Sequence, residues 1–267
     1  MITKLIQNRR GVLLALIAPV IGFTLLLLVG LLFKIEVSKL AGSIINFIVA
    51  AILAFYIFPR RLGIPFGKIE TAEFLQRLGF YLPQKYWKHI VLGLVLAVCT
   101  LSGMWAASFL TGKYVIDPNT ITLAQSVFSL NPAFWEELFY RGVMIFALMP
   151  ITGSLRKAFV IQIVLFGLVH IKGFGIWDIV DAFSVMIMAI EFTFVAYKTR
   201  SLVAGIVFHY FHDALLFFVQ LPQDTAYSAR ENVLFYGCLW LMVGVGCGIT
   251  MLAAEKLGVQ SEKELYV

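Results

Sequence analysis

Two adjacent glutamates and an arginine form the cluster of this sequence that is best suited to chemistry. Glu136 and Glu137 lie in the segment NPAFWEELFYRG, and Arg141 follows Glu137 by four residues, which places both on one helical face. The arginine can therefore neutralise Glu137. Glu136 points about 100° away round the helix, where desolvation and a neighbouring like charge disfavour its ionised form. A carboxyl in that environment is suited to act as a general base near neutral pH.

Two further pairs of residues stand at helical spacing downstream. His170 follows Phe166 by four positions in FGLVH, and Asp213 follows His209 by four positions in FHYFHD, so each pair shares a helix face. Imidazoles exchange protons near neutral pH, and a hydrogen bond to one ring nitrogen sets the role of the other. We expect these side chains to be the partners of Glu136.

The chain around these residues is far more apolar than a soluble domain. Of its 267 residues, 61% are hydrophobic and 13% are charged, whereas roughly a quarter of the residues in soluble proteins are charged. The mean hydropathy is +0.91. Ionisable groups inside hydrocarbon cost about 2.5 to 3.5 kcal/mol each, so those that remain there are functional candidates. They are Glu136, Glu137, Arg141, His170, Asp181, Glu191, His209, His212 and Asp213.

Three members of this set have simpler explanations. Asp181 falls near a membrane edge, and Glu191 stands apart in depth, so both are expected to make ordinary polar contacts. His212, three residues after His209, either supports the site from behind or packs against a neighbouring helix.

Eight apolar stretches are long enough to cross a hydrocarbon core about 30 Å thick at about 1.5 Å per helical residue. They cover residues 11–33, 40–58, 90–111, 127–149, 158–175, 179–198, 201–220 and 233–254. The first is too long for the apolar region of a signal peptide and no cleavage site closes it, so we expect it to be retained. The sequence therefore predicts an all-α, polytopic membrane protein with eight transmembrane helices in a single domain, residues 1–267.

The distribution of positive charge predicts the side of the membrane on which each loop lies. With the N-terminus in the cytoplasm, 15 of the 21 Lys and Arg residues lie on the cytoplasmic side and five on the other, as the positive-inside rule requires. Both termini are therefore expected in the cytoplasm, and the membrane is expected to be the plasma (inner) membrane of a prokaryote. The cations flank helices and do not gather on one face, so the net charge of +6 indicates the lipid bilayer, and not nucleic acid, as partner.

Depth in the membrane brings the candidates together. Counted from the cytoplasmic edge at about 1.5 Å per residue, His170 and Asp213 lie roughly 18 Å deep, His209 roughly 12 Å and Glu136 roughly 16 Å. These four groups come from three helices yet fall within about 6 Å of depth. One polar site buried between the fourth, fifth and seventh helices explains this better than several separate sites.

The longest segment that does not span the membrane covers residues 59–89. Its TAEFLQRLGF stretch places Phe74, Leu75 and Leu78 on one helical stripe. This pattern predicts a short amphipathic helix along the cytoplasmic interface. Such a segment is a common topological feature and says little about chemistry.

Three ordered motifs on the predicted helices carry a family resemblance. They are Glu136-Glu137-x-x-x-Arg141, Phe166-x-x-x-His170 and His209-x-x-x-Asp213. They resemble the motifs of the CPBP (CAAX protease and bacteriocin-processing) family, which includes the type II CAAX prenyl endopeptidases. The helices that bear them lie within residues 127–220. The resemblance implies a glutamate-type intramembrane endopeptidase of eight helices, in which Glu137 and Arg141 hold the motif helix in register.

The resemblance also implies roles for the remaining motif residues. Glu136 and His170 would activate a water molecule, while His209 and the residue at position 213 would bind the oxyanion that forms as water attacks. The CAAX endopeptidases carry Asn where this chain has Asp213. Because an ionised carboxylate cannot donate to an oxyanion, Asp213 would be protonated or would orient His209. This difference favours a branch of the family other than the one that cleaves prenylated proteins.

Other chemistries remain open on the same residues. Zinc could be bound by His170, His209 and either Glu136 or Asp213, whose types suit that metal, although HExxH is absent and water activation by a Glu and a His needs no cofactor. The GxSG and GxGD signatures of rhomboid-type serine and aspartyl proteases are also absent. A channel, transporter or scaffold is a further alternative, although no internal repeat is visible, and so is a non-catalytic immunity protein.

The sequence as a whole favours an endopeptidase that acts, without a metal, on a protein or peptide that is membrane-embedded, membrane-associated or lipid-modified. The predicted catalytic residues are Glu136, Glu137, Arg141, His170, His209 and Asp213.

Overall fold

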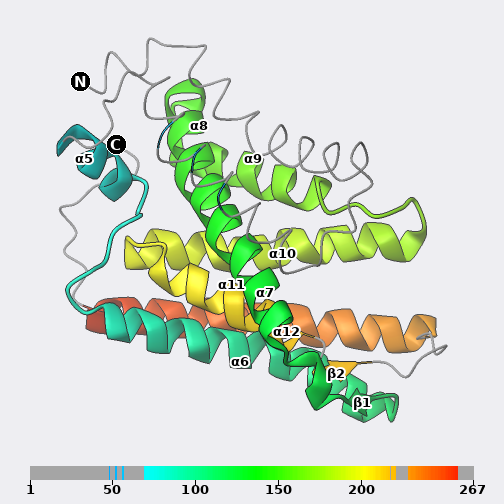
Figure 1. The fold of residues 1–267 in the computed structure, drawn as a ribbon. Coiled ribbons are helices and arrows are strands. Elements are labelled where there is room, and N and C mark those ends of the chain that lie inside the picture. Colours follow the sequence, from blue (N-terminus) through cyan, green and yellow to red (C-terminus); the bar gives the residue numbers. More distant parts are fainter. Residues whose placement is uncertain are drawn as a thin grey trace, which may run out of the picture.

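The computed structural model describes residues 69–216, 218–220 and 228–257, with residues 48, 52 and 56 as single positions. This part of the chain is helical apart from two short strands (Figure 1). The predicted spans 11–33 and 40–58 lie outside the described residues except at those three positions. The structure therefore addresses the six later spans.

Three helices of the described part are long and apolar enough to cross a membrane. They are α6 (Tyr86–Thr111), α10 (Ile176–Thr199) and α12 (Ala229–Leu257). Their lengths of 26, 24 and 29 residues each exceed the roughly 20 residues that a hydrocarbon core requires. α12 packs against both α6 and α10 (Figure 1). The chain is thus a helical integral membrane protein.

The predicted span 127–149 lies within a longer run of helix. It consists of α7 (Leu123–Glu136), the π-helix η3 (Glu137–Met144) and α8 (Ile145–Thr152), which follow one another without a break (Figure 1). The Thr122 side chain caps α7 by accepting a hydrogen bond from the Gln125 N–H. Pro132 lies inside α7, where it removes one backbone donor and weakens the helical ladder one turn before the glutamates.

Two predicted spans are shorter in the structure than in the sequence analysis. α9 (Leu155–Leu168) and α11 (Val203–Leu215) replace the spans 158–175 and 201–220. Their 14 and 13 residues give lengths of about 20 Å, which is less than the hydrocarbon thickness of about 30 Å. Neither helix crosses the core alone, and both end beside residues of the polar site.

The local sequence explains where α9 ends. Residues 171–175 include two glycines, which are poor helix formers. The Gly175 N–H then donates to the carboxylate of Asp178 in the first turn of α10, at 3.0 Å. This bond favours a helix start at α10 over continuation of α9, so His170 lies in a turn and not within a helix.

The end of α11 is fixed by a small antiparallel ladder. β2 (Val219–Gln220) pairs with β1 (Val115–Ile116), which follows α6, so that Val115 lies opposite Gln220 and Ile116 opposite Val219. The 3-10 turn η2 (Pro118–Thr120) then leads into α7. The ladder ties the connections at one end of α6, α7 and α11 together.

The predicted amphipathic helix is confirmed as α5 (Ile69–Arg77), but its apolar face contacts protein. Phe74 and Leu78 are buried in one cluster with Trp135, Leu138 and other residues of α7 and η3. The segment therefore packs against the helix that carries the two glutamates.

Glu191 lies where α10 meets α6 and α12, and it is completely buried. The Thr100 hydroxyl of α6 donates to one carboxylate oxygen at 3.4 Å. Gly246 of α12 faces the other oxygen so closely that a Cβ at this position would collide with it. The carboxyl, predicted to make an ordinary polar contact, thus occupies space that only a glycine on α12 leaves open.

This close approach predicts a difference between two neighbouring glycines. Gly246→Ala should lower the free energy of unfolding by about 1 to 3 kcal/mol, because an added methyl group overpacks a buried contact. Gly244→Ala should be neutral or stabilising, because nothing lies within 4 Å of its added Cβ and alanine is the better helix former. Thermal unfolding in detergent measures both; equal midpoints for the two variants would contradict the close contact.

Candidate functional site

The first motif lies where the long helix changes from α to π geometry. Glu136 ends α7 and Glu137 begins η3, whose eight residues are all buried. A π-helix bonds from residue i to i+5, and such segments occur mostly at functional positions because they realign side chains. The bulged helix therefore presents two adjacent carboxyl groups to different neighbours.

Glu137 forms the buried centre of the site. Its Oε1 lies 3.2 Å from Nη1 of Arg141, and both side chains are 0% exposed. The same oxygen lies 3.0 Å from Nδ1 of His209 on α11. Gly205, one turn before His209, leaves room for Glu137, because a Cβ there would lie 3.0 Å from Oε2. Glu137 therefore joins the long helix to α11.

Arg141 is also held by two aromatic rings. Its Cζ lies 4.1 Å from the ring centroid of Phe166 on α9 and 5.0 Å from that of Phe192 on α10. Phe166 in turn lies 4.6 Å from the ring of His170, and Phe192 lies 4.8 Å from the ring of His209. The guanidinium is thus linked through one phenyl ring to each of the two predicted catalytic histidines.

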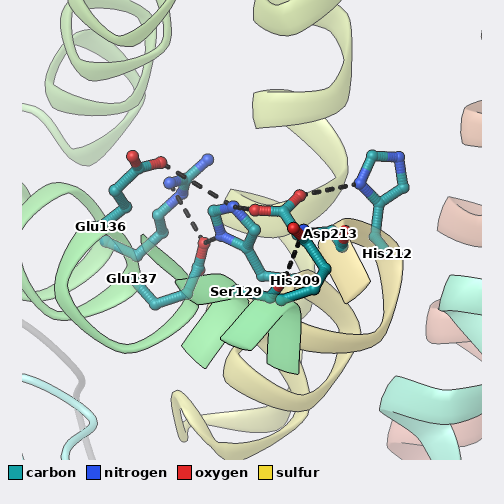
Figure 2. A network of polar contacts seen from close by, with 8 residues as sticks. Ser129, Glu136, Glu137, His209, His212 and Asp213 are labelled. Carbon is teal, nitrogen blue, oxygen red and sulfur yellow. Dashed lines mark hydrogen bonds and ion pairs between the residues drawn. The ribbon is translucent and has the colours of Figure 1, made fainter. Parts of the chain in front are cut away.

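His209 stands between three carboxylates (Figure 2). Nδ1 contacts Glu137, while Nε2 lies 3.8 Å from Oε2 of Glu136 and 3.5 Å from Oδ2 of Asp213. Both ring nitrogens therefore face acceptors, an arrangement that stabilises the doubly protonated, cationic imidazole. A protonated His209 is a hydrogen-bond donor placed between two carboxyl groups.

Glu136 and Asp213 keep more access than the rest of the cluster. Their side chains are 28% and 27% exposed, whereas those of His209 and Glu137 are 8% and 0% exposed. The two accessible carboxylates meet at the same imidazole nitrogen. The accessible side of the cluster therefore consists of Glu136 and Asp213 beside Nε2 of His209, whereas Glu137 lies on the buried side.

His170, in the turn that follows α9, is oriented by a carbonyl group of that helix. Its Nδ1 lies 2.7 Å from the carbonyl oxygen of Phe166. Since a carbonyl can only accept, Nδ1 carries the proton in a neutral ring and Nε2 keeps its lone pair. His170 also interacts electrostatically with Glu136. The structure thus gives this histidine an accepting nitrogen in the neighbourhood of the more accessible glutamate.

The structure brings most of the predicted residues into direct contact. Ion pairs or hydrogen bonds connect Glu136, Glu137, Arg141, His209 and Asp213. Asp181 pairs instead with Lys172 at 3.1 Å on the surface. His212 contacts Asp213 and so belongs to the polar cluster, whereas Glu191 does not share it.

Two contributors to the site were not identified from the sequence. Phe192 follows Glu191 in an apolar helix and carries no motif or spacing signal. Gly205 did have a usable signal, since it lies four residues before His209 and hence on the same face of α11. A small residue there indicates close approach of another helix.

Phe192 provides a prediction that separates positioning from simple packing. Phe192→Leu should lower kcat about tenfold, because the variant loses the ring that contacts both Arg141 and His209, and a desolvated cation–π contact is worth up to about 2 kcal/mol. Phe183→Leu on the same helix is the matched control, since Phe183 is half exposed and contacts Trp240. Equal kcat values in the two variants would show that the Phe192 ring does not position His209.

The side chains of the cluster are poorly suited to bind zinc through His209. Zinc takes imidazole through an unprotonated nitrogen, whereas both nitrogens of His209 face carboxylate oxygens. Within the described residues, no three or more His, Cys, Asp or Glu side chains form a group that could hold a metal ion.

Comparison with known proteins gives one match. Residues 118–215 match the family described as type II CAAX prenyl endopeptidase Rce1-like. No curated protein and no solved structure matches the chain. The matched region runs from η2 to the last residue of α11 and includes every residue of the polar cluster. The similarity to this family is confined to this region, which is less than half of the chain.

Proposed function

We propose that the chain is an intramembrane endopeptidase that hydrolyses a peptide bond in a protein or peptide that is membrane-embedded, membrane-associated or lipid-modified. The observation that carries this proposal is the meeting of Glu136 and Asp213, the two accessible carboxylates, at one nitrogen of His209. The matched family is one of CAAX-type proteases. The three helices of this chain that are long and apolar enough to cross a membrane support a substrate at or within the bilayer.

The proposed chemistry begins with a water molecule between Glu136 and His170. Glu136 removes a proton from this water, and the Nε2 lone pair of His170 orients it by accepting a second hydrogen bond. The oxygen attacks the scissile carbonyl carbon. The carbonyl oxygen becomes an oxyanion, which the cationic imidazole of His209 stabilises through its Nε2–H, a hydrogen that the oxyanion shares with Asp213.

The intermediate then collapses and the C–N bond breaks. Glu136 returns its proton to the departing amine, so that one water molecule is consumed and the carboxyl is restored for the next turnover. Glu137 takes no part in these proton transfers. It holds the Nδ1 side of His209 and pairs with Arg141 behind the reacting groups.

Asp213 supports the donor in this scheme. Its Oδ2 accepts from the same nitrogen of His209 that faces the oxyanion position, and a neighbouring carboxylate favours the protonated imidazole. The orienting role suggested for Asp213 therefore fits the geometry better than a direct contact with the oxyanion. No metal takes part in the proposed reaction.

Cleavage of a labelled peptide library by detergent-purified protein, with and without a strong zinc chelator, tests this proposal. We expect internal cleavage of apolar or lipid-modified peptides that the chelator does not affect. Loss of cleavage with the chelator and recovery with zinc would show a metal centre on the same residues. The absence of products from any peptide would favour a binding or transport protein.

The proposed topology has eight helices with both termini in the cytoplasm, in the plasma membrane of a prokaryote. The excess of Lys and Arg in one set of loops supports it. Reporter fusions in successive loops should alternate between the two sides and end in the cytoplasm. A reporter fused to either terminus and active only outside the cytoplasm would show that the protein has the opposite orientation.

A further inference from the structure

Asp213 lies between two histidines of its own helix (Figure 2). Its Oδ1 is 3.1 Å from Nδ1 of His212, and its Oδ2 is 3.5 Å from Nε2 of His209. Each carboxylate oxygen therefore has its own imidazole partner. The motif residue His209 accounts for only one of these contacts.

His212 has few other polar interactions. Its side chain is 7% exposed, and Phe208 faces it edge-on with ring centroids 6.4 Å apart. Among the described residues its Nε2 has no hydrogen-bond partner, so the bond to Asp213 is the one that orients the ring. A buried imidazole whose single hydrogen bond goes to a site carboxylate acts on that carboxylate more than on packing.

The position of Asp213 matters because two carboxylates compete for one donor. Glu136 and Asp213 both face Nε2 of His209. A free Asp213 side chain could rotate away from His209, and the donor would then be left to Glu136, which the proposed reaction needs as an uncommitted base. An acceptor fixed at both oxygens avoids this competition.

We propose that His212 is a positioning residue that holds Asp213 in place as the hydrogen-bond acceptor for His209. The inference rests on the proposed endopeptidase function. The Nδ1–H of His212 donates to Oδ1, which directs Oδ2 toward His209 and keeps Glu136 available for water. It also accounts for a carboxylate at position 213, because an ionised Asp offers one oxygen to each histidine, whereas an amide has a single acceptor oxygen.

Two substitutions of His212 separate its hydrogen bond from its volume. His212→Leu removes the donor, and we expect kcat to fall roughly 10- to 100-fold with little change in KM, as for a lost hydrogen bond to a charged group. His212→Asn should restore most of kcat, because the amide nitrogen of asparagine can take the place of Nδ1. His89→Leu removes a buried histidine of α6 that lies outside the cluster and should leave kcat unchanged.

The dependence on Asp213 is tested by repeating the His212→Leu change in an Asp213→Asn background. In that background His212→Leu should lower kcat much less than it does in the wild type, because the neutral amide at position 213 has no negative charge for the His212 donor to stabilise. Similar losses in both backgrounds, or failure of His212→Asn to recover activity beyond His212→Leu, would overturn the role of His212 while leaving the endopeptidase function intact. Inactive wild-type protein would overturn the function itself.

Discussion

Glu136→Gln should lower kcat for peptide cleavage by about 10² to 10⁴, which is the usual contribution of a positioned general base. The substitution keeps the size of the side chain and its contact with His209, but an amide cannot take a proton from water. Because the side chain is the most exposed of the first motif, at 28%, the fold should tolerate the change. KM should remain close to the wild-type value, since ground-state binding is unaffected.

The measurement for Glu136 is steady-state cleavage of one substrate peptide by purified protein. Glu255→Gln is the matched control, because this glutamate lies exposed near the end of α12, away from the polar cluster. The control should retain full activity. If Glu136→Gln had the same kcat as the control, Glu136 could not be the general base of the reaction.

Arg141→Met should have the largest effect on stability. The guanidinium is fully buried and pairs with the equally buried Glu137, so its removal leaves an uncompensated charge and should cost about 3 to 5 kcal/mol. Adding Glu137→Gln should recover much of the stability, because the remaining buried groups are then neutral. Activity should stay low in the double variant, since Nδ1 of His209 has lost its carboxylate partner.

Thermal unfolding in detergent, together with cleavage assays, measures both properties. Lys113→Met is the control, since it breaks the ion pair between Lys113 and Glu231, whose side chains are 33% and 21% exposed, and ion pairs that water can reach contribute little. An Arg141→Met protein as stable as this control would show that the buried pair does not hold the fold together.

The contacts of the first motif were predictable because helical spacing determines them. Glu137 and Arg141 form the expected ion pair at i and i+4. The similar depths calculated for Glu136, His209 and Asp213 anticipated the contacts that these residues make across α7 and α11. Local geometry and membrane depth thus carried most of the information about which polar groups meet.

Features that depend on packing were not predictable in the same way. The sequence pattern does not predict the π-helix η3, because this segment is defined by backbone hydrogen bonds along the long helix. The early ends of α9 and α11 were missed because His170 and Val219 lie in apolar runs, where hydropathy cannot distinguish a helix from a turn or a strand packed against protein. The contact of Phe192 with Arg141 requires the placement of α10, which no motif specifies.

Helical spacing also did not predict the contact between His212 and Asp213. Spacing places His212 about 60° from His209 on an ideal α-helix, which favours support or packing over membership of the same face. In the structure the adjacent Asp213 side chain bridges the two rings. Side-chain direction, and not helical position, makes this connection.

In the proposed reaction water, and not a side chain, attacks the peptide bond. This step is tested most directly by a single turnover of the wild-type protein in water labelled with a heavy oxygen isotope, followed by mass spectrometry of both the products and the intact protein. The proposed reaction predicts one heavy oxygen in the new carboxylate of the amino-terminal fragment and a protein of unchanged mass. Heavy oxygen incorporated into the protein, or a peptide bound covalently to Glu136, would show instead that the carboxylate is the nucleophile.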